Sequence, residues 1–374
     1  MPERSKRLLQ VVARPEILGG GVSCAWSICQ ALPDWEHSVW FCTSGSIPAH
    51  TRAALAGHRL HAAAVHTAAA LRDAAPDAVL MHNTTATAFP PAILEALEGV
   101  EGVEGAADLA GSPGGPPALY FWHGSYGALG DCAPLAAACR RQFAVSAHLA
   151  RQLPLPEAAV WHQPVPAPPM PMQPAPAEPQ GHEAPLAVGR LCNPREENWP
   201  AEICDFYRGL AARRPGVRWE FVGCPEALQE PLAVACGGGA TFHPASQAAR
   251  SLLWRWDAML YESTAVTHAY GRVVCEAQQA GCVPVVDARG GFVEQIEDGR
   301  TGFLCATPDD FPAALAALAP LPARRAIAAA ARLAGSARGS CERWRERFLA
   351  VVADLAVRPP GSRAGARSSP PPAG

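Results

Sequence analysis

Two short segments carry residues whose types and spacing suit binding of a phosphorylated ligand. Gly19, Gly20 and Gly21 stand between an apolar run and a helical pattern, where N–H groups at a helix start can bind phosphate oxygens. Arg190 and Arg195 follow another apolar run, and each guanidinium offers forked donors to a diphosphate. The alternative for the glycines is a flexible turn. The alternative for Arg190 and Arg195 is a pair of solvated arginines, because all but one of the 31 basic residues are arginine.

A second group of candidates lies in the segment 268–304. It contains His-Ala-Tyr-Gly-Arg-Val-Val-Cys-Glu-Ala at 268–277, Gly-Cys-Val-Pro-Val-Val at 281–286, Gly-Gly-Phe-Val-Glu at 290–294 and Asp-Gly-Arg-Thr-Gly at 298–302. The two oxygens of the Glu276 carboxylate can accept hydrogen bonds from both hydroxyls of a ribose. The alternative for Glu276 is an ordinary carboxylate on a helix.

This segment resembles the donor-binding part of glycosyltransferase family 4, the retaining sugar transferases with the GT-B fold. That family has, in this order, a glutamate, a Phe-Gly or Tyr-Gly pair, Glu-Ala, Gly-x-Pro-Val-Val, Gly-Gly-x-x-Glu and Asp-Gly-x-Thr-Gly. Gly189, Arg190 and Leu191 with Arg195 are similar to its Gly-Arg-Leu-x-x-x-Lys, and His123 is similar to its histidine after a first-domain strand. The likeness covers most of the second half firmly and the first half loosely.

The resemblance implies a retaining glycosyltransferase, of the hexosyltransferase type, that uses a nucleotide-diphosphate-sugar donor and an unknown glycan, lipid or small-molecule acceptor. Arg190 and Arg195, with amides near Gly20 and Gly21, would neutralise charge on the leaving diphosphate. The implied sugar and ribose contacts are His123, which would orient the sugar, His268, which would touch it, and Glu276, which would hold the ribose. The remaining donor-binding residues would be Tyr270, Gly271, Gly290 and Gly291. The resemblance implies no metal and no cofactor, since the nucleotide sugar is a substrate.

Two positions depart from the family's pattern. Arg195 stands where lysine is usual, which phosphate binding tolerates. His268 stands where the first glutamate holds hydroxyls of the transferred sugar, and histidine is a weaker acceptor. The alternative from another class is therefore a nucleotide- or glycan-binding pseudoenzyme with the same fold. A GT-B sugar-nucleotide epimerase or phosphorylase is a second enzymatic alternative.

The cysteines and histidines show no metal-ligand spacing in the sequence. The 13 cysteines are scattered singly, without a Cys-x-x-Cys, which disfavours disulfides and structural zinc and is typical of a reducing compartment. Five histidines without acidic or cysteine partners at ligand spacing are predicted to lie at the surface: His37, His50, His58, His61 and His66. We therefore expect no metal site.

Short apolar runs alternate with helical patterns along both halves of the chain. They predict strands at 8–13, 38–42, 78–81, 119–122, 142–145, 186–188, 219–222, 258–260 and 283–286, and helices at 22–32, 87–97, 133–140, 201–213, 272–280, 311–318 and 338–357. Such alternation favours parallel sheets with right-handed crossovers. The predicted fold class is α/β, with two doubly wound Rossmann-like domains facing across a cleft, which is the GT-B arrangement. Ligands would bind beyond the carboxyl ends of the strands.

Three segments rich in proline or glycine divide the chain. We expect a mobile insertion at 99–117, a proline-rich linker at 166–185 and a disordered tail at 358–374. They bound a first, acceptor-side domain at 1–165 and a second, nucleotide-sugar-binding domain at 186–340. The helical pattern at 341–357 would cross back to the first domain, as the last helix of GT-B enzymes does.

Composition limits the class of protein. With 374 residues and 49% hydrophobic side chains, the chain has enough apolar surface for two or three domains, which excludes a wholly disordered protein. A net charge of -3 gives no reason to expect nucleic acid as a partner. Arg4, Lys6 and Arg7 allow at most a peripheral membrane contact. No run approaches the roughly 18–20 apolar residues of a spanning helix, and no signal-peptide pattern is present, so we expect a cytoplasmic protein.

Overall fold

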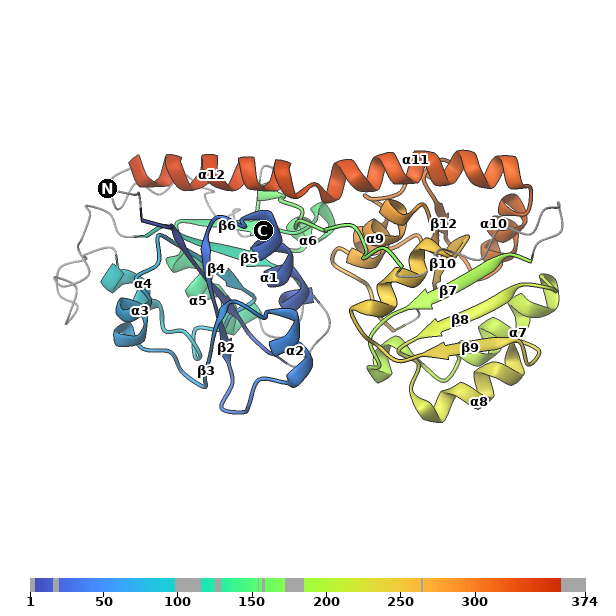
Figure 1. Ribbon diagram of the computed structural model, residues 1–374, viewed down its shortest axis with the longest axis horizontal. Coiled ribbons are helices and arrows are strands. Elements are labelled where there is room, and N and C mark those ends of the chain that lie inside the picture. Colours follow the sequence, from blue (N-terminus) through green and yellow to red (C-terminus); the bar gives the residue numbers. More distant parts are fainter. Residues whose placement is uncertain are drawn as a thin grey trace, which may run out of the picture.

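The computed structural model describes residues 4–15, 20–97, 116–124, 129–153, 155–156, 159–171, 185–263 and 265–357. These residues form two parallel β-sheets with helices packed against them, and the two layered units lie side by side (Figure 1). Most of the expected insertion at 99–117, residues 172–184 of the expected linker, and the tail at 358–374 lie outside the described residues.

Strands and helices alternate along the described chain. The strands are β1 (Arg7–Val12), β2 (Glu36–Cys42), β3 (Arg59–Ala63), β4 (Ala78–His82), β5 (Ala118–Trp122), β6 (Arg141–Ala144), β7 (Ala187–Leu191), β8 (Arg218–Val222), β9 (Ala240–His243), β10 (Ala258–Tyr261), β11 (Val283–Asp287) and β12 (Phe303–Cys305). The α-helices are α1 (Gly20–Ala31), α2 (Ala49–Ala54), α3 (Ala68–Ala74), α4 (Pro91–Leu97), α5 (Leu129–Ala138), α6 (Ala147–Gln152), α7 (Ile203–Arg213), α8 (Glu226–Ala235), α9 (Arg272–Ala280), α10 (Asp310–Leu318), α11 (Leu321–Gly339) and α12 (Cys341–Val357). Short 3-10 helices are η3 (Glu196–Asn198), η4 (Ala248–Trp254) and η5 (Gly290–Phe292).

The two sheets have the same topology. The first has the strand order β3-β2-β1-β4-β5-β6, and the second, read from its other edge, has β9-β8-β7-β10-β11-β12. All the pairings are parallel. Each sheet therefore reverses its winding direction between its first and fourth strands, the switch point at which such sheets bind ligands. The predicted pair of doubly wound Rossmann-like domains is confirmed.

The strands that the sequence did not predict lie at sheet edges. β3, β9 and β12 are edge strands, and many of their side chains are only partly buried or exposed, so their sequences carry no continuous apolar run. The predicted helix at 87–97 begins later, at Pro91, because proline is favoured in the first turn, where its missing N–H is not needed.

Two histidines predicted to lie at the surface are buried. His37 is 4% exposed, and its Nε2 lies 2.8 Å from the Leu32 carbonyl oxygen. His66 is 2% exposed and stacks on Trp40 with 4.9 Å between ring centroids. The surface prediction was wrong for both because an imidazole ring packs as an aromatic when it is neutral, and burial lowers the pKa of His66 to about 4.

The last two helices run along both domains. α11 and α12 lie nearly in line along one side of the molecule, α11 beside the second domain and α12 beside the first (Figure 1). α11 packs closely on α9, since a Cβ at Gly335 would lie 2.7 Å from the Cβ of Gln278. In α12, Trp344 stacks on Trp161 at 5.3 Å and belongs to the core beneath α1 and the first sheet. The C-terminal chain therefore joins the two domains through packed side chains.

Among the described residues, no single helix has the length and hydropathy to cross a membrane. The bent pair formed by 310–318 and 321–356 meets the length and composition criteria together, with a bend of 102° between its parts. All 13 cysteines lie in the described part of the chain, and all are free thiols.

Candidate functional site

A cavity of about 230 Å³ lies between the two domains at the carboxyl ends of their strands. The first domain supplies the start of α1, His123 after β5, and the segment at Gln163. The second supplies residues after β7 and β8, the start of η4, Tyr261 at the end of β10, and the beginning of α9 with the loop before it. Six of the predicted site residues line this cavity: Gly20, His123, His268, Tyr270, Gly271 and Glu276.

Gly271 fixes the direction in which α9 leaves the 268–271 loop. Its φ of 80° lies in the left-handed region, and a Cβ there would lie 2.2 Å from the Phe292 ring, so only glycine fits without a rearrangement. The helix that follows is buried along most of its length and ends at Gly281, which is also left-handed. This start places Glu276, in the second turn of α9, in the cavity wall.

Glu276 lies beside two arginines that the sequence analysis did not select. The carboxylate is 2% exposed, and its Oε1 is 3.2 Å from Arg250 Nη1 and 3.9 Å from Arg272 Nη2. Arg250 comes from η4, and burial, which Glu276 opposes, lowers the pKa of its guanidinium. Both arginines line the cavity. The spacing of Arg272 and Glu276, four residues apart on one helix, was the available signal, whereas no sequence pattern indicated Arg250.

The same two arginines connect the second domain to the first. Arg250 Nη2 donates to Ser23 Oγ on α1 at 3.3 Å. Arg272 donates to Ser27 Oγ at 2.7 Å and to Gln163 Oε1 at 2.8 Å. Because these donors are buried or nearly so, the hydrogen bonds fix both guanidinium groups at the boundary of the two domains.

Arg190 and Arg195 do not line the cavity. Arg190 is fully buried and donates to the backbone carbonyls of Glu262 and Asn198, both at 2.8 Å. Its guanidinium also lies over the Tyr261 ring, 4.4 Å from the centroid. The Arg195 side chain is 43% exposed and pairs with Glu197. The predicted diphosphate contact therefore has no support in the geometry: one guanidinium holds the backbone beneath the site, and the other faces solvent.

The His268 ring is hydrogen-bonded to Tyr261, and both residues line the cavity. Its Nε2 lies 2.8 Å from the Tyr261 hydroxyl, which itself donates to Asn198 Oδ1 at 3.1 Å. Burial, with the positive charges of Arg190 and Arg289, lowers the pKa of His268 to about 4, so the ring is neutral near pH 7. In this hydrogen-bond pattern His268 Nε2 donates its proton to Tyr261, which leaves Nδ1 as an acceptor.

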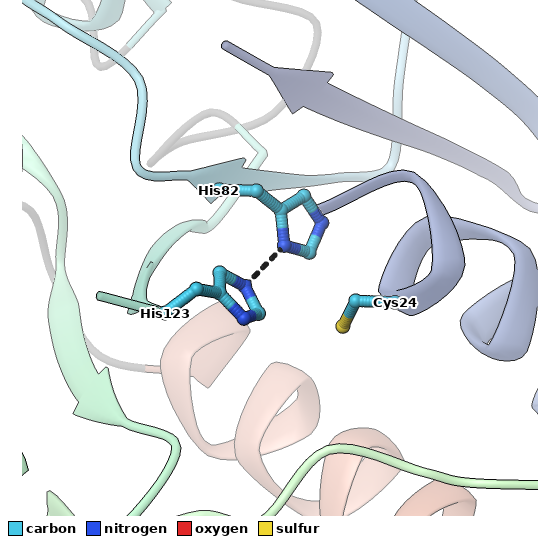
Figure 2. A group of neighbouring side chains, drawn as sticks. All are labelled: Cys24, His82 and His123. Carbon is cyan, nitrogen blue, oxygen red and sulfur yellow. Dashed lines mark hydrogen bonds between the residues drawn. The ribbon is translucent and has the colours of Figure 1, made fainter. Parts of the chain in front are cut away.

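His123 ends a chain of hydrogen bonds that comes from the core of the first sheet. Its Nε2 lies 2.8 Å from Nδ1 of His82 (Figure 2). Nε2 of His82 in turn lies 3.2 Å from Gln10 Oε1. Gln10 donates its amide to the Ala25 carbonyl at 3.2 Å, which orients Oε1 toward His82. The proton of His82 is therefore on Nε2, and the proton of His123 is on its own Nε2. Burial, with His82 and Arg272 adding to it, lowers the pKa of His123 far below its usual value.

Three of the predicted glycines pack behind the cavity wall. A Cβ on Gly290 would lie 2.4 Å from the His268 carbonyl oxygen, and one on Gly291 would lie 2.3 Å from the Ala269 carbonyl oxygen. Glycines there let η5 contact the 268–271 loop, which they support from outside the cavity. Gly21 faces β1, since its Cβ would lie 3.0 Å from Val12. Only Gly20, at the start of α1, is in the wall.

Glu294 joins the two domains beside the cavity. Its carboxylate accepts from the backbone N–H groups of Ala147 at 2.9 Å and His148 at 3.1 Å, at the start of α6. It also lies 3.2 Å from His162 Nε2. Although burial raises the pKa of Glu294, these hydrogen bonds outweigh it and hold the pKa below its usual range. The carboxylate is therefore a fixed interdomain acceptor.

Comparison with known proteins gives a family match for the second domain and the fold of the whole chain. Residues 184–319 match the family model of glycosyl transferases group 1. HepE from Anabaena, solved with UDP and glucose, aligns with a TM-score of 0.67 at 16% identity over 93% of this chain and 100% of its own. A glycosyltransferase from Rickettsia africae aligns with a TM-score of 0.67 at 12% identity over 95% and 100%. WaaG, a glycosyltransferase of lipopolysaccharide biosynthesis, aligns with a TM-score of 0.60 at 13% identity over 92% and 99%. These structures have the GT-B fold, as this chain does. A search of curated protein sequences found no match.

Proposed function

We propose that this chain, whose residues 184–319 form a glycosyl transferases group 1 domain, transfers a sugar from a nucleotide-diphosphate-sugar donor to an acceptor with retention of configuration. The observation that carries the proposal is the interdomain cavity in which Arg250 and Arg272 lie beside Glu276. Two guanidinium groups suit a diphosphate, and a carboxylate suits the hydroxyls of a ribose. The structure of HepE with UDP-glucose supports a ligand of this class.

Arg250 and Arg272 are the cations we assign to the leaving diphosphate, in place of Arg190 and Arg195. Negative charge develops on the diphosphate as the sugar leaves, and preorganised cations in a cavity of low dielectric stabilise that charge strongly. Arg250 pairs with Glu276 and lines the cavity. When the donor binds, Arg250 would turn from Glu276 to a phosphate oxygen, which leaves the Glu276 carboxylate to accept from the ribose. The backbone N–H of Gly20, at the start of α1, adds a donor for phosphate.

The transferred sugar, which we take to be a hexosyl group, would lie between His123 and His268. Both imidazoles are neutral near pH 7 because burial lowers their pKa values, so neither adds a positive charge beside the diphosphate. His268 Nδ1 would accept from a sugar hydroxyl, and the buried His123 Nδ1, which has no partner among the described residues, is the acceptor that the bound sugar would have to reach. The acceptor would enter on the face from which the diphosphate leaves and pass its proton to the departing phosphate. This route needs neither an enzyme nucleophile nor a metal, and the free thiols are consistent with a cytoplasmic location.

Thermal stabilisation by nucleotides tests the donor site. We expect one of UDP, GDP, ADP or TDP, at about 100 times its dissociation constant, to add about 2.7 kcal/mol to the free energy of unfolding. Glu276→Ala should lose most of this shift. The matched control Glu297→Ala, at a carboxylate whose side chain is 61% exposed and pairs with Arg300, should keep it. An equal shift in wild type and Glu276→Ala, or no shift with any nucleotide, would contradict the proposal.

A non-catalytic nucleotide- or glycan-binding protein is the second candidate, and His268 favours it. Its Nε2 is hydrogen-bonded to Tyr261, and the ring is neutral at the position where the similar family has a glutamate. Release of nucleoside diphosphate distinguishes the two functions. A transferase releases it in proportion to added acceptor, whereas a binding protein shows the nucleotide shift without turnover over an acceptor panel.

A further inference from the structure

Three metal-ligand side chains meet at the first-domain wall of the cavity. Cys24 comes from α1, His82 ends β4 and His123 follows β5, and one ligand atom of each lies within 4.8 Å of the others (Figure 2). These residues are far apart in the sequence, so no short spacing motif joins them. They converge because β1 is paired with β4 and β4 with β5, and α1 follows β1 directly.

The histidines are prepared as ligands by their surroundings. His82 is 1% exposed, and each of its ring nitrogens faces one partner, Gln10 or His123. Gln10 Oε1 accepts from His82 Nε2, which leaves a lone pair on Nδ1 that faces His123. A hydrogen bond from the outer ring nitrogen to a carbonyl oxygen is the arrangement that orients metal-binding histidines. Gln10 is itself fixed by the Ala25 carbonyl.

We propose that Cys24, His82 and His123 bind one zinc-class transition-metal cation, and that this cation blocks the sugar end of the cavity. One sulfur and two imidazole nitrogens select zinc-like or softer cations over Mg²⁺ and Ca²⁺, which prefer oxygen ligands. His123 lines the cavity while Cys24 and His82 are each 1% exposed. His123 is therefore the ligand that connects such a site to the cavity.

The two ligand nitrogens need to move only a short distance, and the Cys24 sulfur lies within 4.8 Å of them. Zinc–nitrogen bonds of about 2.0–2.1 Å put two ligand nitrogens of a tetrahedral site about 3.3 Å apart. The facing nitrogens of His82 and His123 are 2.8 Å apart, so they must separate by about 0.5 Å. His123 shifts its proton from Nε2 to Nδ1, which has no hydrogen-bond partner among the described residues, and Cys24 releases its thiol proton to solvent. Burial raises the pKa of the Cys24 thiol and Arg272 opposes this only in part, so metal binding itself must displace the thiol proton.

Blocking of the site rests on the proposed function, since the cation takes as a ligand His123, one of the two histidines assigned to the donor sugar. Binding of the cation itself does not. Two readouts therefore separate the claims: a spectrum reports the metal site, and competition with a nucleotide sugar reports its position in the donor site.

Cobalt(II) tests the site on the full-length, chelator-treated protein. We expect one equivalent of Co²⁺ to give a near-ultraviolet thiolate charge-transfer band and the visible bands of a tetrahedral site, both removed by Zn²⁺ and unaffected by Mg²⁺. Cys24→Ser should abolish the thiolate band. Cys42→Ser, which changes a partly buried thiol of the same domain, should keep it. His82→Gln should weaken Co²⁺ binding at least tenfold and gives a second test should Cys24→Ser be unstable.

The refuting results are equally specific. A thiolate band that persists in Cys24→Ser, or Co²⁺ bound without a thiolate band, would overturn the site. For a nucleotide sugar that binds the metal-free protein, Zn²⁺ should raise its dissociation constant in wild type and leave it unchanged in Cys24→Ser; unaltered affinity in zinc-loaded wild type would overturn the blocking role. If no nucleotide sugar binds the metal-free protein, the proposed function fails while the cobalt spectrum still decides the metal site.

Discussion

Arg250 is the residue whose substitution tests the assignment of the diphosphate cations most directly. Its guanidinium is in the cavity wall, 3.2 Å from Glu276, and its side chain is only 12% exposed. Arg195, the residue favoured by the sequence pattern, has a side chain that is 43% exposed and pairs with Glu197. Arg250→Met keeps the length and apolar stem of the side chain and removes the charge. Arg195→Gln is the matched control.

The magnitude follows from the surroundings of each guanidinium. Two unit charges 4 Å apart attract by about 4 kcal/mol at an effective dielectric constant near 20. Arg250 gives up part of its interaction with Glu276 when it turns to a phosphate, so the net loss on substitution is nearer the roughly 1.5–3 kcal/mol of a charged hydrogen bond. That corresponds to an affinity for nucleoside diphosphate weaker by about 10- to 150-fold. An exposed ion pair such as that of Arg195 contributes about 0–1 kcal/mol, and its loss should change the affinity by less than about fivefold.

Titration calorimetry with a nucleoside diphosphate and with the corresponding nucleoside measures this difference. In Arg250→Met the diphosphate should bind more weakly by the stated factor, while the nucleoside should bind no more weakly than in wild type, because Glu276 remains available to the ribose. Equal losses for nucleoside and diphosphate would show that Arg250 acts by shaping the cavity. A larger loss in Arg195→Gln than in Arg250→Met would refute the assignment.

Two further predictions concern stability. Arg190→Met should lower the free energy of unfolding by about 3 kcal/mol, because two buried carbonyls lose a charged donor. Denaturant titration measures this loss. Wild-type stability combined with lost nucleotide binding would instead place Arg190 in the donor site. Glu294→Gln should cost about 1–3 kcal/mol at pH 7. The pKa of Glu294 in the folded protein is below its unfolded value of about 4.3, so its stabilisation is complete above that pH and is lost as the pH falls through the folded pKa. The difference in free energy of unfolding between wild type and Glu294→Gln should therefore shrink at pH 4. A difference that grew on acidification would contradict this account.

The fold could be predicted from the sequence wherever a strand is buried on both faces. β4 and β5 are continuous apolar runs, and the helices between such strands have clear patterns. β3, β9 and β12 could not be found in this way, because an edge strand needs no continuous apolar sequence when its pairing partner supplies the hydrogen bonds. Topology decided their positions, and topology depends on contacts between residues far apart in the chain.

The site was predictable to the extent that backbone geometry determines it. Gly271 has a left-handed backbone and packs against Phe292 so closely that only glycine fits, and it starts the helix that carries Glu276, so the pattern placed both at the cavity. Arg190 shows the limit of such patterns. Its position at the end of β7 was predicted, but the direction of its side chain depends on Tyr261 and on carbonyls from other elements, none of which the spacing of Arg190 and Arg195 contains.

If Arg250 and Arg272 bind the diphosphate as proposed, they couple donor binding to the arrangement of the domains. Each lies beside Glu276 in the cavity, and each donates to a serine on α1, so the same two guanidinium groups serve the ligand site and the domain boundary. A diphosphate that draws on their charge changes the hydrogen bonds that connect the domains, and a change in domain angle moves the cations away from the ligand. Glu276 makes no interdomain hydrogen bond among those found in the described residues, so its substitution separates the two effects: it should weaken the ligand while leaving the contacts to α1 in place.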